Sequence, residues 1–344
     1  MQKLGKMDGA LDRDYNFYAP ENVIHSLSPS INWIFGKGNG LPYGMGVLLY
    51  GKPKSGKSLV SEIMAGGVHA ANPDAMVVKF DTEYREDNSS RALWNIDDSR
   101  YQAYNTNKPV EIFDRINDEF VPMLEEGMPL KLIIIDSVKG IEGVKEGDAD
   151  KSTDHLMGDH ALTIGKGLKR ILPIIRKYKI ALICCEHVRA NLNAGTYGPK
   201  EHAAGGWAEK HFFEYYVEVK RAGGAENNKS MAGESFEGDI KATEKKKELL
   251  ARKVIVKMAD NTKSINGREA LITLHRLNGL VNVEDEVFTL GWRYGIITKE
   301  GARSYVIGNQ KFDGKPKVLQ TLKENVEMQQ FIIKSISEKD VAMI

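Results

Sequence analysis

The sequence has few cysteines, no long apolar run and no excess of charge of either sign. Its 344 residues include only Cys184 and Cys185 as thiols, and their adjacency excludes both a crosslink between distant segments and the spacing of a metal site. We expect both to be buried and reduced. No apolar run approaches the ~18 residues of a membrane span, and the N-terminus lacks the apolar segment of a secretory signal. These absences predict a cytoplasmic protein without a membrane partner.

The charges nearly cancel, with 48 Lys and Arg residues against 47 Asp and Glu residues and a net charge of +1. This balance excludes a histone-like polycation and an acidic tail protein. The total hides one basic block, because residues 151–200 carry 9 basic and 3 acidic side chains, a net of +6. Residues 101–150 carry 5 basic and 11 acidic side chains, a net of −6. A polyanion partner is therefore compatible with the sequence if it binds one surface.

Short apolar runs alternate with helical patterns from about residue 44 onward. Unbroken apolar runs are typical of strands covered on both faces, so the alternation predicts an α/β fold with a mainly parallel twisted sheet flanked by helices. Later runs lack helical spacers and predict an antiparallel β extension, followed by a small C-terminal helical cap. The expected strands are 46–50, 76–80, 132–136, 180–185, 212–220, 253–258 and 270–275, and the expected helices are 57–70, 109–125, 154–179 and 241–252.

Residues 51–58 read GKPKSGKS, a complete phosphate-binding loop pattern between an expected strand and an expected helix. Its glycines let backbone N–H groups turn toward phosphate oxygens, and the helix N-terminus adds its dipole. We expect Lys57 to reach the β- and γ-phosphates of ATP and the Ser58 hydroxyl to bind Mg²⁺. The residues expected to hold the nucleotide here are Gly51, Lys54, Ser55, Gly56, Lys57 and Ser58.

Two further polar positions follow apolar strands. Asp136 ends the run LIIID, which places a carboxylate for Mg²⁺ at the edge of the sheet beside the phosphates, and Ser137 follows within reach of water or the γ-phosphate. Glu83 follows another strand and is the best candidate for the base that orients the attacking water. Its charged neighbours leave open the alternative of a solvated loop, and a lone histidine such as His187 after the fourth strand is commonly structural.

The order of these features resembles the RecA family of DNA strand-exchange ATPases over residues 24–331. A Gly-Leu-Pro-x-Gly turn leads into the phosphate loop, FDTEYRED is similar to the family's segment with the catalytic glutamate, and IIIDSVKGI is similar to its Asp-Ser strand end. The stretch LMGDHALTIGKGLKRILPIIRKYKIALICCEHVR follows the family's loop, helix and next strand without a gap. The stretches GTYGPKEHAAGGWAEKHF and NVEDEVFTLGWRYGIITKEGARSYV resemble its second DNA-binding loop and its segment after the core.

The resemblance implies a RecA-like P-loop ATPase core at 25–305, an N-terminal arm at 1–24 that contacts a neighbouring protomer, and a cap at 306–344. Its catalytic residues would be Glu83, Lys57, His187 and Asp136. Asp87 would contact adenine, and Lys257 and Lys263 would act on the ATP of a neighbouring protomer. DNA would be held by segments 142–158 and 189–206, with the contacts made by Lys169, Arg170, Arg189, Tyr197, Gly205 and Gly206.

The function implied is ATP-dependent homologous recombination. Such a protein forms helical filaments on single-stranded DNA, pairs it with homologous double-stranded DNA and hydrolyses ATP when DNA is bound, with a single-strand-binding protein or a loader as a further partner. His187 stands where most bacterial members carry glutamine, and a histidine at this position is similar to the phage UvsX-type recombinases. This similarity predicts a location in the bacterial cytoplasm, in a host that a phage has infected. Ser90 replaces the aromatic residue that stacks on adenine. A ring-forming, helicase-like motor and an accessory paralogue that binds nucleotide remain the alternatives.

Overall fold

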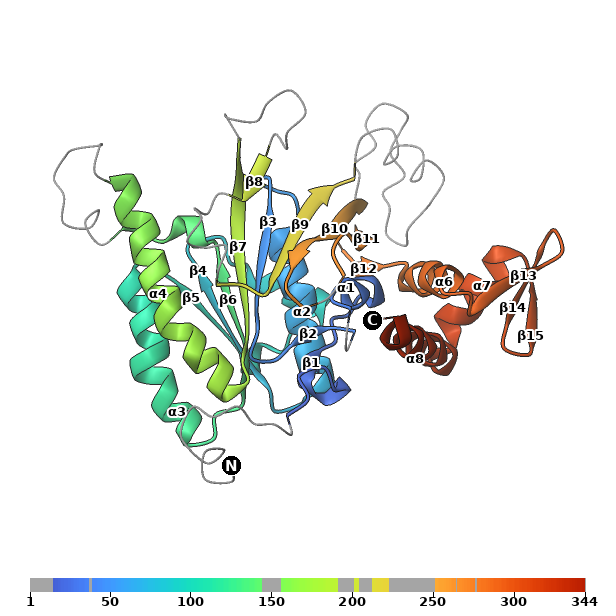
Figure 1. The fold of residues 1–344 in the computed structure, drawn as a ribbon, viewed down its shortest axis with the longest axis horizontal. Helices are drawn as coiled ribbons and strands as arrows, with labels where there is room; N and C mark the ends of the chain where they lie inside the picture. Colours follow the sequence, from blue (N-terminus) through green and yellow to red (C-terminus); the bar gives the residue numbers. More distant parts are fainter. Residues whose placement is uncertain are drawn as a thin grey trace.

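The computed structural model describes residues 15–36, 39–143, 156–190, 201–203, 212–222, 251–263, 265–275 and 277–343. Figure 1 shows a large sheet with helices on both sides and a mainly helical cap beyond one end. The strands of this sheet are β3 (Gly46–Gly51), β4 (Met76–Asp81), β5 (Tyr101–Asn105), β6 (Leu130–Asp136), β7 (Ala181–Ala190), β8 (Glu201–Ala203), β9 (Tyr215–Arg221), β10 (Ala251–Asn261), β11 (Glu269–His275) and β12 (Gly279–Val281).

The strand that leads into the phosphate loop lies in the middle of the sheet. The order is β12-β11-β10-β9-β3-β7-β6-β4-β5, and β8 pairs with β7. All neighbours from β9 to β5 pair in parallel, whereas β9 with β10, β10 with β11 and β11 with β12 are antiparallel. The prediction of a mainly parallel sheet with an antiparallel extension is confirmed. Because parallel strands end at one edge, the segments after β3, β4, β6 and β7 meet there.

Helices cover both faces of the parallel part. Val47 and Leu49 of β3 belong to one buried cluster with Ile63, while Leu48 between them belongs to another with Ile164. This alternation is the period of a strand that is buried on both faces. The helices concerned are α1 (Pro29–Ile34) and α2 (Lys57–Ala71) on one face, and the π-helical η5 (Val110–Phe120), α3 (Val121–Glu125) and α4 (Leu156–Tyr178) on the other.

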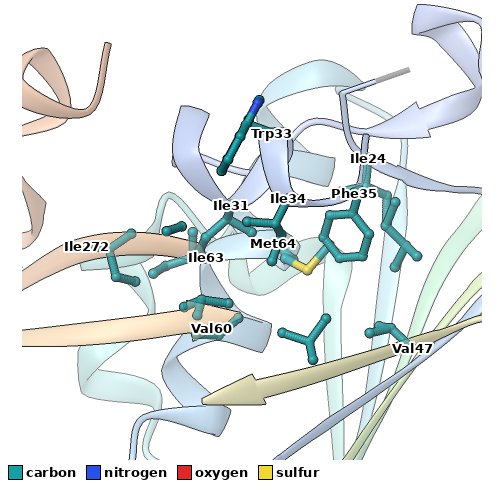
Figure 2. Close-up of a cluster of buried hydrophobic side chains, with 14 of the residues drawn as sticks. Ile24, Ile31, Trp33, Ile34, Phe35, Val47, Val60, Ile63, Met64 and Ile272 are labelled. Carbon is teal, nitrogen blue, oxygen red and sulfur yellow. The ribbon is translucent and has the colours of Figure 1, made fainter. Parts of the chain in front are cut away.

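The core on the α2 side holds the phosphate-loop helix against the sheet. Figure 2 shows Ile31 and Ile34 of α1 together with Ile63 and Met64 of α2 and Val47 of β3. All five side chains are at most 1% exposed. Truncating a side chain buried to this degree costs about 2–5 kcal/mol in other proteins. The N-terminus of α2 is therefore carried on a rigid support.

Two glycines in α2 allow other segments to approach the helix closely. A Cβ atom at Gly66 would lie 1.7 Å from the carbonyl oxygen of Trp94, and one at Gly67 would lie 2.1 Å from the carbonyl oxygen of His25. Trp94 ends the 3₁₀ helix η3 (Asn88–Trp94). Backbone at both positions occupies the space that any larger residue would need, so glycine is required here for packing.

Beyond the large sheet, the chain forms a cap of helices and short strands. It contains a three-stranded antiparallel sheet among its helices, and the expected boundary at 305/306 falls inside one of its strands. The domain division itself stays a prediction. In chain order the elements of the cap are α6 (Val283–Arg293), β13 (Ile297–Glu300), β14 (Ser304–Ile307), β15 (Gln310–Asp313), α7 (Gly314–Glu324) and α8 (Val326–Met343).

Buried polar contacts join the cap to the core. Glu286 of α6 accepts hydrogen bonds from the Ser28 hydroxyl at 2.5 Å and from the Ser30 N–H at 3.0 Å, at the start of α1. Arg268 directly precedes β11, and its guanidinium group donates two buried hydrogen bonds to the carboxylate of Asp340 in α8, at 2.8 and 2.5 Å. Both partners of each contact are distant in sequence, so these joints fix how the cap sits on the core.

The described part of the N-terminal arm packs on its own protomer. Lys179 lies over the rings of Tyr15 and Phe17, at 3.9 and 4.7 Å from their centroids, and Arg176 lies 4.4 Å from that of Phe17. Residues 1–14 of the predicted arm lie outside the described residues.

Cys184 and Cys185 are buried and unbridged, as their position in an apolar strand predicts. No helix within the described ranges is long and apolar enough to cross a membrane.

Candidate nucleotide site

The phosphate loop takes a conformation that only some residues adopt easily. Strand β3 ends at Gly51 and α2 begins at Lys57, with Lys54 and Gly56 at φ of 62° and 115° between them. A Cβ atom at Gly51 would lie 2.2 Å from the Val219 carbonyl oxygen. The glycines of the motif are thus required by the left-handed turn and by the close approach of β9. The resulting loop ends at a helix N-terminus, which is favourable for phosphate.

Lys57 is held at the floor of the loop. Its ammonium group donates to the carbonyl oxygens of Gly51 and Lys52, both at 3.2 Å, and lies 3.4 Å from Nδ1 of His187. Burial lowers the pKa of Lys57, and nearby groups including Asp136 oppose this change. These carbonyl contacts keep the side chain extended toward the place where phosphate oxygens would bind.

Glu83 receives three polar contacts. Its Oε1 accepts from the Ser137 hydroxyl at 3.0 Å and from Nε2 of His187 at 2.9 Å, while its Oε2 pairs with Arg85 at 2.7 Å. Burial acts to raise the pKa of Glu83, but the bonds from His187 and Ser137 and the charge of Arg85 bring it below its ordinary value. The carboxylate is therefore held ionised, as a group that accepts a proton from water must be.

One histidine tautomer satisfies both neighbours of His187. The Lys57 ammonium group can only donate, so Nδ1 must accept; the Glu83 carboxylate accepts, so Nε2 must carry the proton. The imidazole of His187 thus connects Lys57 to the candidate base Glu83. His187 ends the parallel pairing of β7 with β3, where it lies opposite Gly51.

These side chains surround one cavity of about 140 Å³. Seven of the predicted residues line it, because they follow or begin elements that end at the same sheet edge. Ser58 and Asp136 supply a hydroxyl and a carboxylate, which are hard oxygen ligands of the kind that Mg²⁺ takes. The lining residues are Lys54, Gly56, Lys57, Ser58, Leu59, Glu83, Arg85, Asp136, His187 and Arg252.

Mg²⁺ fits this donor set if substrate phosphates complete its coordination. Within the described segments, no group of three or more His, Cys, Asp or Glu side chains could hold a metal. Mg²⁺ in nucleotide sites commonly uses one or two protein oxygens, with waters and phosphates as the other ligands. Ser58 at the start of α2 and Asp136 at the end of β6 supply that number.

Asp87 lies away from this cavity. It is exposed, caps η3 through the Ser89 N–H at 2.9 Å, and lines a separate hollow of about 810 Å³ with Asn88, Arg91 and Tyr101. The hydrogen bonds from Ser89 lower the pKa of Asp87. An adenine contact by Asp87 stays a prediction, and this hollow is where it would occur.

Arg85 and Arg252 are charged cavity residues that the sequence analysis missed, along with the apolar Leu59. Arg252 is the second residue of β10, and one of its guanidinium nitrogens would lie 3.9 Å from a Cβ atom placed at Gly56. Burial, with Arg221 as a second cause, lowers the pKa of Arg252. The helix expected at 241–252 lies outside the described residues except for its last two, which belong to β10, so that part of the prediction is wrong. The alternating apolar pattern after Ala251 was the available signal.

The two lysines expected to act on a neighbouring protomer lie away from their own phosphate loop. Lys257 is half-buried within β10, opposite Glu218 and Glu269. Lys263 follows β10, next to Thr262, whose N–H binds the Glu214 carbonyl at 3.2 Å where β3 starts. Lys263 is thus at the opposite edge of the sheet, whereas Lys257 is in register with Tyr50 of β3 through Glu218 of β9, and neither lysine lines the nucleotide cavity.

The DNA-contact predictions are only partly placed by the structure. Lys169 and Arg170 are exposed on α4, and Arg170 forms an ion pair with Asp114 of η5. The backbone of Arg189 belongs to β7, but its side chain lies outside what the structure describes. The described residues do not include Tyr197, Gly205, Gly206 or most of segments 142–158 and 189–206.

This chain is similar to known proteins over most of its length. The model of the RecA N-terminal domain matches residues 16–258. Protein RecA of Ureaplasma parvum serovar 3 is 27% identical over 323 residues, which cover 94% of this chain and 87% of that protein. Protein RecA of Francisella tularensis subsp. novicida is 25% identical over 341 residues, covering 98% and 84%. Both relatives are bacterial and give no support to a phage origin.

Proposed function

Since this chain belongs to the RecA family, we propose that it is a DNA-dependent ATPase of homologous recombination. It forms filaments on single-stranded DNA and promotes pairing and strand exchange with a homologous duplex. The observation that carries the ATPase proposal is the continuous set of contacts from Lys57 through His187 to Glu83 and Ser137, beside Asp136, in one cavity.

The roles follow from this geometry. Backbone N–H groups of the phosphate loop and the Lys57 ammonium group bind the polyphosphate of ATP, and Glu83 orients a water molecule in line with the γ-phosphate and accepts its proton. Mg²⁺, held by Ser58 and Asp136, would neutralise charge on the β- and γ-phosphates. His187 contacts Lys57 and Glu83 together, so a γ-phosphate that draws Lys57 forward also changes the contacts of His187.

This link also gives a route from ATP to DNA. His187 lies in β7, and the second DNA-binding segment, 189–206, starts two residues later. Sequence-neutral binding requires contacts to phosphates and stacked or inserted side chains. Arg189, Tyr197, Gly205 and Gly206 would make these contacts, with Lys169 from α4. Arg170 would join them only by giving up its ion pair with Asp114.

Assembly would complete the site. Lys257 and Lys263 would meet the ATP of a neighbouring protomer, where they would stabilise transition-state charge. The proposed division of the chain is an N-terminal arm at 1–24, an ATPase core at 25–305 and a cap at 306–344. A loader or a single-strand-binding protein would be a partner in the cytoplasm, and the proposal of a phage-infected host rests on His187 alone.

ATP hydrolysis with and without single-stranded DNA tests the proposal. Wild type should hydrolyse ATP faster when DNA is added, Lys57→Ala should lose both rates, and Lys334→Met, which removes an exposed lysine of α8, should match wild type. A wild-type rate that DNA does not change would contradict the proposal. Formation of joint molecules between homologous DNAs then separates a recombinase from a ring-forming motor, because only the recombinase pairs a single strand with a homologous duplex.

A further inference from the structure

We propose that Lys79 is a positioning residue for ATP hydrolysis. Together with Glu62 and Glu86 it ties the phosphate-loop helix to the loop that carries Glu83, and so fixes the candidate base relative to the bound phosphates. This inference rests on the ATPase function proposed above. None of the three residues lines the nucleotide cavity, so each acts only through the groups it holds.

The loop after β4 is wrapped around one buried carboxylate. Asp81 is 3% exposed, and its two oxygens accept from the N–H groups of Glu83 at 3.0 Å and of Arg85 and Glu86 at 2.5 Å each. This ring of bonds sets the shape of residues 81–86. It does not by itself fix the loop relative to the phosphate-loop helix, because every donor lies in the loop itself.

The far end of the loop is fixed by a buried ion pair. The Glu86 side chain is 6% exposed and lies 2.6 Å from the Lys79 ammonium group. Its other oxygen accepts from Nε and Nη2 of Arg91 in η3, at 3.1 and 2.9 Å. Lys79 in the middle of β4 thus holds a residue only three positions beyond Glu83.

The same ammonium group also faces α2. Lys79 lies 3.7 Å from Glu62, whose position four residues after Ser58 places it one helical turn along α2, the helix that follows the phosphate loop. The side chain of Lys79 is 4% exposed and that of Glu62 is 13% exposed. One buried cation therefore lies between a carboxylate of the phosphate-loop helix and a carboxylate of the catalytic loop.

Burial makes this arrangement restrictive. A charge that has left water is tolerated only while its partners stay in contact, so moving either carboxylate away would remove one of the two partners of the buried Lys79. Helix and loop must then move as one unit. Apolar side chains of similar volume would give comparable stability but would lack the directional contacts that a charge pair imposes. The effect of these charges on hydrolysis can therefore be tested separately from their effect on packing.

The decisive variant replaces the three charges together. Glu62→Leu/Lys79→Met/Glu86→Leu keeps the site filled and leaves Arg91 paired with Asp98, so we expect it to fold, as circular dichroism and urea unfolding would show. Its kcat should fall by up to about 100-fold, the loss expected when a catalytic group is misplaced by about 1 Å. Its KM for ATP should stay within about threefold of wild type, and Lys334→Met serves as the matched control.

Isosteric variants decide the question if the triple variant is unstable. Glu62→Gln and Glu86→Gln each remove one charge and keep its size, and their effects on kcat should be non-additive because both act through Lys79. A wild-type kcat in the folded triple variant, or in both glutamine variants, would overturn the inference, as would a loss confined to KM. An inactive wild type would instead contradict the proposed ATPase function, so the two failures are distinguishable.

Discussion

The contact between cap and core should weaken as the pH rises. Glu286 is buried at the joint with α1, and burial raises its pKa from 4.5 to about 7 although Ser28 and Ser30 donate hydrogen bonds to it. A carboxyl group whose pKa is higher in the folded state stabilises that state while protonated, so stability falls as the pH rises from 4.5 and levels off above 7. For these pKa values the loss between pH 5.5 and pH 8 is about 2 kcal/mol.

Urea unfolding of wild type and Glu286→Gln at both pH values measures this loss. Glutamine has nearly the same size but does not ionise, so the difference between the two proteins isolates Glu286 from other groups that titrate. One such group is Glu62, whose pKa burial also raises to about 7. Wild type should lose about 2 kcal/mol more than the variant between the two conditions. A difference between the proteins that is equal at both pH values would refute the reasoning.

Three further predictions concern hydrolysis and packing. Glu83→Gln should still bind single-stranded DNA with ATP but release it slowly, as fluorescence anisotropy after dilution would show; rapid release would exclude Glu83 as the base. Asp340→Asn leaves the buried guanidinium of Arg268 without its counter-charge and should lower the free energy of unfolding by about 3–5 kcal/mol, whereas an unchanged urea midpoint would contradict that joint. Gly167→Ala places a Cβ atom 2.3 Å from the ring of Phe113 and should cost about 1–3 kcal/mol in the same titration; a variant as stable as wild type would show that α4 can shift.

The central strands could be predicted because burial on both faces leaves unbroken apolar runs. The runs at 46–50 and 76–80 fall within one residue of β3 and β4. The strand β5 (Tyr101–Asn105) was not expected, since it lies at the edge of the sheet and only Tyr101 in it is buried. The residue pattern by itself also does not predict the three short strands of the cap, because residues 297–313 carry few of the alternating apolar positions that identify a strand.

The site could be predicted where it depends on strand ends. Lys57, Asp136 and Glu83 meet because parallel strands place their carboxyl ends at one edge, which sequence order alone implies. The approach of Arg252 depends on how an antiparallel strand is paired across the sheet, which no local pattern reveals.

The charged segment after β4 shows the same limit. A solvated loop was the open alternative there, yet Asp81 and Glu86 are buried. Asp81 is satisfied by backbone N–H groups of the following turn, and Glu86 by Lys79 and Arg91. Side chains of opposite charge that meet only after folding cannot be paired by inspection of FDTEYRED alone.

The joints between cap and core have a consequence for synthesis of the chain. Ser28 meets a partner 258 residues later, Trp33 one 261 residues later, and Arg268 one 72 residues later. On the ribosome, the polar groups of α1 and its N-cap therefore lack these hydrogen-bond partners until almost the whole polypeptide has emerged. We expect nascent chains that stop before Asp340 to expose this surface, and so to be substrates for chaperones even when the nucleotide core has already formed.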